Sequence, residues 1–191
     1  MVKEDRTLAN LDDNTLVDLA LLEKNQKAWT ALITRYYGKV ASTVYRIIGK
    51  SADAEDVVQE VFTEMAKAIK IYKRDSLFST FLYRIAVNTT YKYIQKNMNR
   101  IETAEEPEFF LQIGDKSSGS ESSMIKQEKA QIVNSAMKKL SPEKRFALTL
   151  YEVEGVPLKE ISEILKQPLQ TVWSRINQAK KELYEILSLS M

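Results

Sequence analysis

Polar side chains that can hydrogen-bond to DNA bases follow Pro168, near the C-terminal end of the chain. Between them, Val172 and Ile176 recur at helical spacing, which predicts a helix that begins near Leu169. A second apolar pattern at helical spacing precedes Pro168, and the tight connection between the two patterns predicts a helix-turn-helix. In such a motif the first residues of the second helix meet base edges in the major groove. The candidates for this contact are Gln170, Thr171, Ser174 and Arg175.

The same apolar pattern also fits a helical hairpin in an ordinary all-α core, so the motif alone leaves two interpretations open. The role of Trp173 also has two interpretations. Its indole could pack on a sugar or on a thymine methyl group in DNA, or it could pack against the preceding helix.

Basic and acidic residues are segregated in the first half of the chain. Residues 65–100 hold eight basic residues and one acidic residue, a net charge of +7, with six aromatic residues among them. Basic groups interleaved with aromatic rings are typical of nucleic-acid binding. Residues 53–64 instead hold five acidic residues and no basic one. The two stretches therefore predict two different partners.

The chain contains neither cysteine nor histidine, which excludes thiol nucleophiles, disulfides, imidazole bases and the usual zinc ligands. One enzymatic alternative remains, in which Asp53, Glu55, Asp56 and Glu60 bind the metal ions of a phosphodiester-processing enzyme. Exposed carboxylates on a helix are more commonly a solvated or protein-binding surface, so we expect no catalytic residue, no cofactor and no bound metal. No apolar run is long enough to span a membrane, and we expect a cytoplasmic protein.

The apolar periodicity predicts an all-α fold with two small helical domains. Residues 1–98 form a four-helix domain, in which Asp12 or Asp13, Asn25, Ser51 and Ser76 are the expected N-caps of the helices. Gly49 is expected to stop the second helix in a left-handed conformation.

Residues 99–123 are predicted to be a flexible acidic linker. Residues 102–123 hold six acidic residues and one basic residue, together with Pro107 and several Gly and Ser residues. The apolar triplet 109–111 is either a local packing patch or a docking element. Residues 124–191 form the second domain, which starts with a helix from about Met124 to Leu140 and restarts at Ser141 as N-cap. We expect the two domains to move independently.

These strings resemble the extracytoplasmic-function sigma factors of bacteria. Asp53 to Phe62 and Phe78 to Asn88 are similar to the region 2 signature of that family. The segments Leu140 to Arg145, Ile161 to Leu165 and Thr171 to Arg175 are similar to its region 4. Order and spacing agree over nearly the whole chain.

The resemblance implies a function and a set of contact residues. It implies that the chain binds core RNA polymerase at the coiled coil of the β′ subunit, directs transcription from specific promoters, and is held by an anti-sigma factor. A base flipped out of the melted −10 element would be captured by the turn at residues 70–76. The implied polymerase contacts are Asp53, Asp56, Gln59 and Glu60. The implied −10 contacts are Lys70, Lys73, Arg74, Ser76, Arg84, Asn88 and Lys92. The implied −35 contacts are Gln170, Thr171, Trp173, Ser174, Arg175 and Gln178.

The chain departs from the family pattern at a few of these positions. The family commonly has Trp where Phe81 stands, Asp and Arg where Lys92 and Gln95 stand, and Gly and Lys where Gln170 and Trp173 stand. These departures bear on which promoter sequence is read. The chief alternative function is a helix-turn-helix regulator that acts as a dimer on duplex operators. Such a regulator would have no need for an acidic helix beside a basic, aromatic one.

Overall fold

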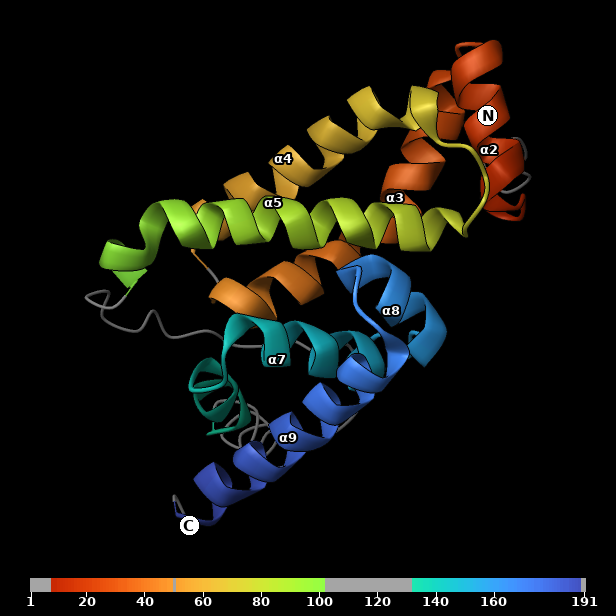
Figure 1. The fold of residues 1–191 in the computed structure, drawn as a ribbon. Coiled ribbons are helices and arrows are strands. Elements are labelled where there is room, and N and C mark those ends of the chain that lie inside the picture. The colour runs from red at the N-terminus through yellow and green to blue at the C-terminus, as the bar shows by residue number, and fades with distance from the viewer. Residues whose placement is uncertain (1–7, 50, 102–131, 190–191) are drawn as a thin grey trace, which may run out of the picture.

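The computed structural model describes residues 8–49, 51–101 and 132–189, and regular structure within these ranges is entirely helical (Figure 1). The N-terminal unit contains α2 (Asp13–Leu22), α3 (Gln26–Ile48), α4 (Ala52–Ala68), the 3₁₀ turn η1 (Ile69–Ile71) and α5 (Phe78–Ile101). The C-terminal unit contains a helix at residues 132–138, α7 (Pro142–Leu148), the π-helical segment η2 (Thr149–Val153), α8 (Leu158–Leu165) and α9 (Leu169–Ser188). The predicted all-α class with two helical units is confirmed.

Short side chains cap most of the helices, as predicted. Asp12 accepts from the amide of Thr15 at 3.1 Å, and Asn25 accepts from the amides of Lys27 and Ala28. Such caps satisfy amides that have no partner inside the helix and are worth about 1 kcal/mol each. The predicted caps Ser51 and Ser141 are also confirmed, and Gly49 ends α3 with a positive φ of 84°.

The predicted cap at Ser76 is wrong. A cap at Ser76 would start the helix at Leu77, but α5 begins at Phe78, and its first hydrogen bond runs from the amide of Phe81 to the carbonyl of Leu77. The carbonyl of Ser76 instead accepts from the Tyr72 hydroxyl at 2.7 Å. This local hydrogen bond, between residues four apart, keeps Ser76 in the turn that precedes α5.

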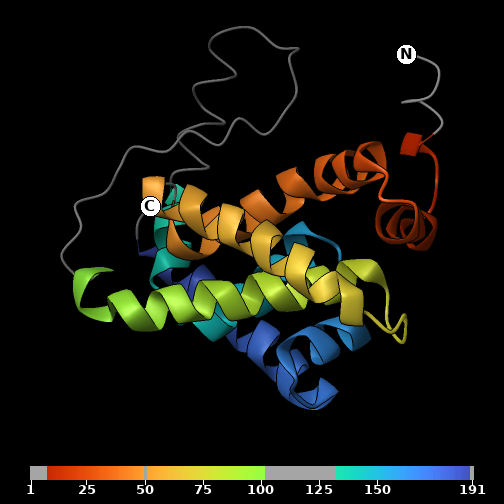
Figure 2. The same cartoon turned by 90° about the horizontal axis from the view of Figure 1, so that it is seen from above.

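The N-terminal unit has its own hydrophobic core. α3, α4 and α5 each contact the other two, and α2 packs on α3 (Figure 2). Phe78 and Leu82 at the start of α5 are buried among the apolar faces of the other helices. Complete burial of side chains of this size contributes about 1.5–3 kcal/mol each.

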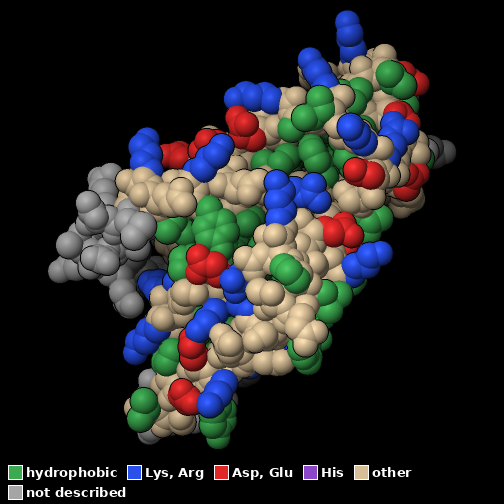
Figure 3. Space-filling model, in the orientation of Figure 1, with side chains coloured by type: hydrophobic (Ala, Val, Ile, Leu, Met, Phe, Trp, Pro, Cys, Tyr) green, Lys and Arg blue, Asp and Glu red, His purple; other side chains and the backbone are tan. Residues whose placement is uncertain are grey.

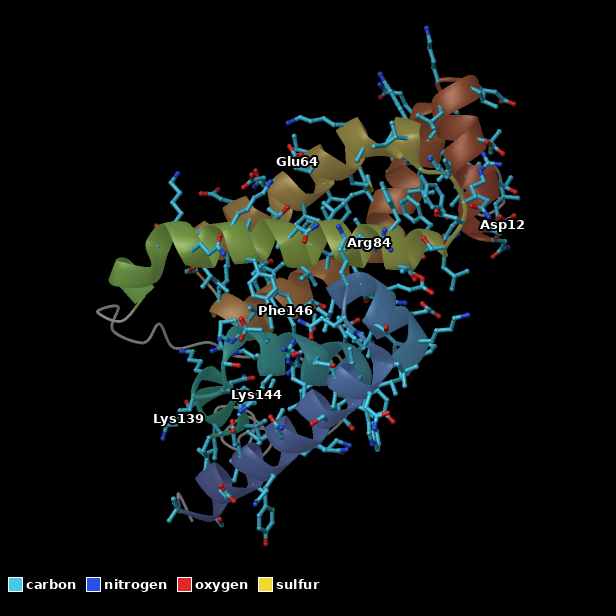
Figure 4. All side chains as sticks on the ribbon, viewed as in Figure 1. Asp12, Glu64, Arg84, Lys139, Lys144 and Phe146 are labelled. Carbon is cyan, nitrogen blue, oxygen red and sulfur yellow. The ribbon has the colours of Figure 1, made fainter. Side chains whose placement is uncertain are left out.

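The second core joins the two units, which the sequence did not predict. Ile47 of α3 and Tyr83 and Val87 of α5 are buried in one cluster with Phe146 and other residues of the C-terminal unit. Tyr91 of α5 packs on Phe146, with ring centroids 4.9 Å apart, and Figure 4 shows Phe146 where α7 faces the N-terminal unit. In this structure the two units therefore pack together. The aromatic rings of the basic stretch were interpreted from sequence as nucleic-acid groups, but Tyr83 and Tyr91 pack between the units and the other four pack in the core of the N-terminal unit.

Hydrogen bonds reinforce the contact between the units. The Tyr83 hydroxyl donates to Glu154 at 2.9 Å, and Thr80 Oγ1 donates to Glu160 at 3.0 Å. Burial, together with the negative charge of Glu154, raises the pKa of Tyr83, so its hydroxyl remains a donor at neutral pH. Arg145 donates to the carbonyl of Ile47, and burial lowers its pKa to about 10, which leaves it charged at neutral pH.

Most of the predicted linker, and the triplet 109–111 within it, lie outside the described residues. The start of the helix predicted from Met124 also lies outside them, and its described part covers residues 132–138.

Candidate nucleic-acid interface

The predicted helix-turn-helix is present. α8 and α9 are joined by Lys166, Gln167 and Pro168, and Lys166 has the left-handed conformation, with φ 52°. The turn is held by the Ser162 hydroxyl, which donates to the carbonyl of Gln167 at 2.6 Å. Pro168 directly precedes α9, as the sequence predicted.

The first turns of α9 present a polar outer face. Val172, Ile176 and Ala179 are buried, whereas most of the predicted DNA contacts are exposed. Arg175 is half-buried. Burial raises the pKa of Tyr91 on α5, and the positive charge of Arg175 partly counters this rise. The exposed −35 candidates are Gln170, Thr171, Trp173, Ser174 and Gln178.

The Trp173 ring contacts the ring of Tyr151 in η2. The sequence-based alternative was packing against the preceding helix, α8. The two rings meet edge to face, with centroids 6.3 Å apart. Trp173 remains 44% exposed.

The turn before α5 carries most of the predicted −10 contacts. Lys70, Lys73 and Arg74 are exposed, and Ser76 is partly buried. Arg74 has a positive φ of 61° and forms an ion pair with Asp18 of α2. The predicted DNA contact at Arg74 therefore has an internal partner in this structure.

Sequence reasoning missed three features of this turn. Asp18 carries no signal, because it lies 56 residues from Arg74 in the chain. Tyr72 braces the turn through its hydroxyl and through ring contacts with Phe78 and Phe81. Ile71 and Leu77 leave apolar side chains 76% and 61% exposed. Their position beside a run of basic residues was the only available signal.

The other −10 candidates lie along α5. Arg84, Asn88 and Lys92 are four residues apart, so they share one face of the helix. Asn88 and Lys92 are exposed, and Arg84 is half-buried. Figures 3 and 4 show basic side chains, Arg84 among them, where α5 passes over α8. Arg84 and Lys92 make this face of α5 basic, which suits contact with a phosphate backbone.

The predicted polymerase contacts lie on α4. Asp56, Gln59 and Glu60 are exposed. Asp53 is also exposed, but it accepts a hydrogen bond from the Tyr93 hydroxyl of α5 at 2.9 Å. Figure 3 shows acidic side chains along the edge formed by α4, with basic side chains among them. Lys67 in the last turn of α4 pairs with Glu64 at 2.7 Å, which lowers the pKa of Glu64.

The geometry gives no support to the metal-dependent enzyme. Within residues 8–49, 51–101 and 132–189, no three Asp, Glu, Cys or His side chains are arranged to hold a metal ion. Within the same ranges, no helix is long and apolar enough to cross a membrane.

Comparison with known proteins identifies the family. Residues 32–100 match Sigma-70 region 2, and residues 130–183 match Sigma-70 region 4. The ECF RNA polymerase sigma-E factor of Escherichia coli K12 is 38% identical over 178 aligned residues, and the alignment covers 88% of this chain and 93% of that protein. The sigma-E factor of Haemophilus influenzae is 35% identical over 177 aligned residues, with 87% of this chain and 93% of that protein covered. The chain belongs to the extracytoplasmic-function (ECF) sigma factors.

Solved structures confirm the fold of this sigma factor. CnrH, in a complex with the cytosolic domain of CnrY, matches with a TM-score of 0.69 at 20% identity, covering 94% of this chain and 99% of that one. The sigma factor RpoE from Bartonella quintana, in a complex with the anti-sigma factor NepR, matches with a TM-score of 0.67 at 18% identity, covering 86% and 99%.

Family membership assigns this sigma factor to promoter-directed initiation of transcription. It also disfavours the dimeric regulator, because region 2 accounts for the acidic and basic helices that such a regulator would not need. The individual contact residues and the domain boundaries 1–98, 99–123 and 124–191 stay predictions.

Proposed function

We propose that this ECF sigma factor binds core RNA polymerase through α4, opens and reads the −10 element with the turn before α5 and the face of α5, and reads the duplex −35 element with α9. The observation that carries this division is the charge pattern. α4 carries exposed carboxylates, whereas the turn and α5 carry exposed basic side chains. The proposed contacts with the polymerase and with DNA therefore lie on different faces of adjacent helices.

The turn at residues 70–77 is suited to an extruded base. Flipping a base out of the duplex costs a few kcal/mol, which must be recovered by contacts to the base and to phosphates. Lys70 and Lys73 supply exposed charge, while Ile71, between them in the chain, and Leu77 supply exposed apolar surface. Because most aromatic rings of this stretch are occupied in packing, these aliphatic side chains take a larger share of the base contact.

The protein works in the cytoplasm, where polymerase and promoters are. Its inhibitor is a protein of the anti-sigma class, like the partner in the RpoE complex.

Transcription with purified components tests the proposal. Core RNA polymerase is incubated with this protein and a promoter library, and the 5′ ends of the transcripts are sequenced. We expect starts downstream of a shared pair of −35 and −10 sequences that are absent with core alone. Transcript ends that do not change when the protein is added would contradict the proposal.

A pair of alanine variants tests the division between duplex and opened DNA. Arg175→Ala should weaken binding to a duplex −35 fragment by ~1–3 kcal/mol if the guanidinium reads a base. Asn88→Ala should leave duplex binding intact and reduce strand opening. A promoter with a pre-melted −10 bubble should not rescue the defect of this variant, because the lost contact is to the extruded base. Equal loss of duplex binding in both variants would show that the two residues do not act at separate steps.

A further inference from the structure

Trp173 places a large, partly exposed indole on the helix that we assign to the −35 duplex. It follows the buried Val172 and lies one turn into α9, next to the exposed polar residues Gln170 and Ser174. An exposed aromatic side chain surrounded by polar groups gains stability only when an apolar partner covers it. The question is which partner this position offers.

The indole of Trp173 contacts a residue that packs on the C-terminal core. Tyr151 lies in the π-helical segment η2, partly buried against the C-terminal core, and meets Trp173 edge to face. The Lys180 ammonium lies 5.3 Å from the centroid of the Tyr151 ring and pairs with Glu152 at 2.5 Å. Tyr151 thus contacts two side chains of α9. Edge-to-face contacts are worth about 0.5–1.5 kcal/mol, enough to favour one position of an exposed ring.

The charge around the indole favours nucleic acid as the partner. Residues 169–181 of α9 hold three basic residues and no acidic one. Lys180 pairs with Glu152 and Lys181 pairs with Glu185 at 4.0 Å, but both pairs are exposed and weak, so a phosphate can displace either carboxylate. A polyanion is therefore attracted to the helix face beside Trp173.

Only one group at a base edge in the major groove is apolar, the C5 methyl group of thymine. We propose that Trp173 reads a thymine methyl group in the −35 duplex, and that Tyr151 is the positioning residue that holds the indole for this contact. The inference rests on the proposed function, because it takes α9 as the −35 reader. A ring that is already held loses less conformational freedom on binding, so the contact gains selectivity.

Uracil substitution isolates the methyl group. The holoenzyme, formed from core polymerase and this protein, is first used to select a promoter from a randomised duplex pool. Each thymine of the selected −35 element is then replaced singly by deoxyuridine, which removes the methyl group and keeps the base pair. At one position we expect an affinity loss of about fourfold, the value of one buried methyl group.

Variants then connect this discrimination to the two residues. Trp173→Ala should bind the thymine and uracil promoters equally. Tyr151→Leu should lose most of the discrimination, and Tyr151→Phe, which keeps the ring, should retain it. Tyr184→Ala serves as the matched control, because Tyr184 is a 75% exposed aromatic residue at the far end of the same helix. If Tyr151→Leu does not fold, the comparison of wild type with Trp173→Ala still decides the assignment of the methyl group.

The outcomes separate this inference from the proposed function. If no −35 uracil changes the affinity while Arg175→Ala still weakens duplex binding, Trp173 does not read a methyl group, yet α9 remains the −35 reader. Equal discrimination by wild type and Trp173→Ala would overturn the inference in the same way. If the holoenzyme selects no promoter at all, the proposed function itself fails.

Discussion

Arg74 combines a left-handed backbone with an ion pair to a distant helix. A residue with a Cβ atom loses about 1–2 kcal/mol in this conformation, so the surroundings must hold it there. The Asp18 carboxylate supplies one such contact, and the Tyr72 hydroxyl fixes the neighbouring carbonyl of Ser76. The sequence marked Arg74 as a DNA contact but carried no sign of Asp18, because only the folded chain brings α2 to this turn.

Removing the carboxylate of Asp18 tests what the pair does to DNA binding. The pair is exposed and is therefore worth only ~0.2–1 kcal/mol, so a phosphate can displace it. Asp18→Asn frees Arg74, and binding to a promoter with an opened −10 bubble should tighten by up to about fivefold. Titration of labelled bubble DNA at several salt concentrations measures this effect. Glu23→Gln, which removes an exposed carboxylate just past the end of the same helix, should change binding far less.

If Glu23→Gln gives the same gain, the effect comes from net charge and not from the pair. If Asp18→Asn weakens binding instead, Asp18 is needed to hold the turn in its binding conformation.

The helices themselves were largely predictable from sequence, because their signals are local. A cap such as Asn25 joins groups two or three residues apart, and the apolar pattern around Pro168 fixes both helices of the motif. The partners of each face were not predictable in this way. From sequence, Tyr83 and Tyr91 were interpreted as nucleic-acid contacts because they lie among basic residues. In the structure both pack on the C-terminal unit, and the hydrogen-bond partner of Tyr83 is 71 residues away in the chain. The chain between the two units gives no signal of which faces will meet.

The role of α4 is tested by reversing Asp56 and Glu60 to Lys. Both are exposed, so the helix should keep its structure, while attraction to a basic surface on the polymerase becomes repulsion. Affinity for core polymerase, measured by titration, should fall by ~1–2 kcal/mol, since two exposed contacts of up to ~1 kcal/mol each are lost. Asp53 is better changed to Asn, because it lies in the first turn of α4 and accepts from Tyr93.

The matched control for this reversal is Glu23→Lys with Glu163→Lys. Both residues are exposed and lie outside α4, and the pair changes the net charge by the same amount. Its affinity for core polymerase should stay close to that of the wild type. An equal loss in both double variants would mean that overall charge, and not the surface of α4, determines binding.

At the scale of the whole molecule, the packing of the two units is the main difference from the sequence-based expectation. The packed form buries apolar groups of α3 and α5 against α7, and adds the hydrogen bonds of Tyr83 and Thr80. It also places α5 and α9, the helices that we propose for the −10 and −35 elements, in one shared core. If spanning both elements requires the two units to separate, the energy of this contact opposes promoter binding.

The contact can be measured by cleaving the chain at a protease site inserted within residues 102–131. We expect the two fragments to remain together in gel filtration, because the shared core and its hydrogen bonds hold them. Thr80→Val combined with Tyr83→Phe removes the donors of two of the inter-unit hydrogen bonds, keeps the bond from Arg145 to Ile47, and should weaken the association by ~1–3 kcal/mol. Thr90→Val is the control, since its hydroxyl donates to the carbonyl of Ala86 within α5 and so makes a bond inside one unit. Wild-type fragments that separate completely would show that the units are independent after all.

Tyr83 also predicts how this association depends on pH. Its pKa is raised above the ordinary value of 10.0 by burial and by Glu154, so the folded contact favours the neutral hydroxyl. The stabilisation is therefore complete below about pH 10 and is lost as the pH rises through the higher pKa of the packed form, when the phenolate can no longer donate and repels the carboxylate. Fragment association should weaken above pH 10 in the wild type. Tyr83→Phe should start weaker and lose less, and an identical pH dependence in both proteins would remove Tyr83 as the titrating group.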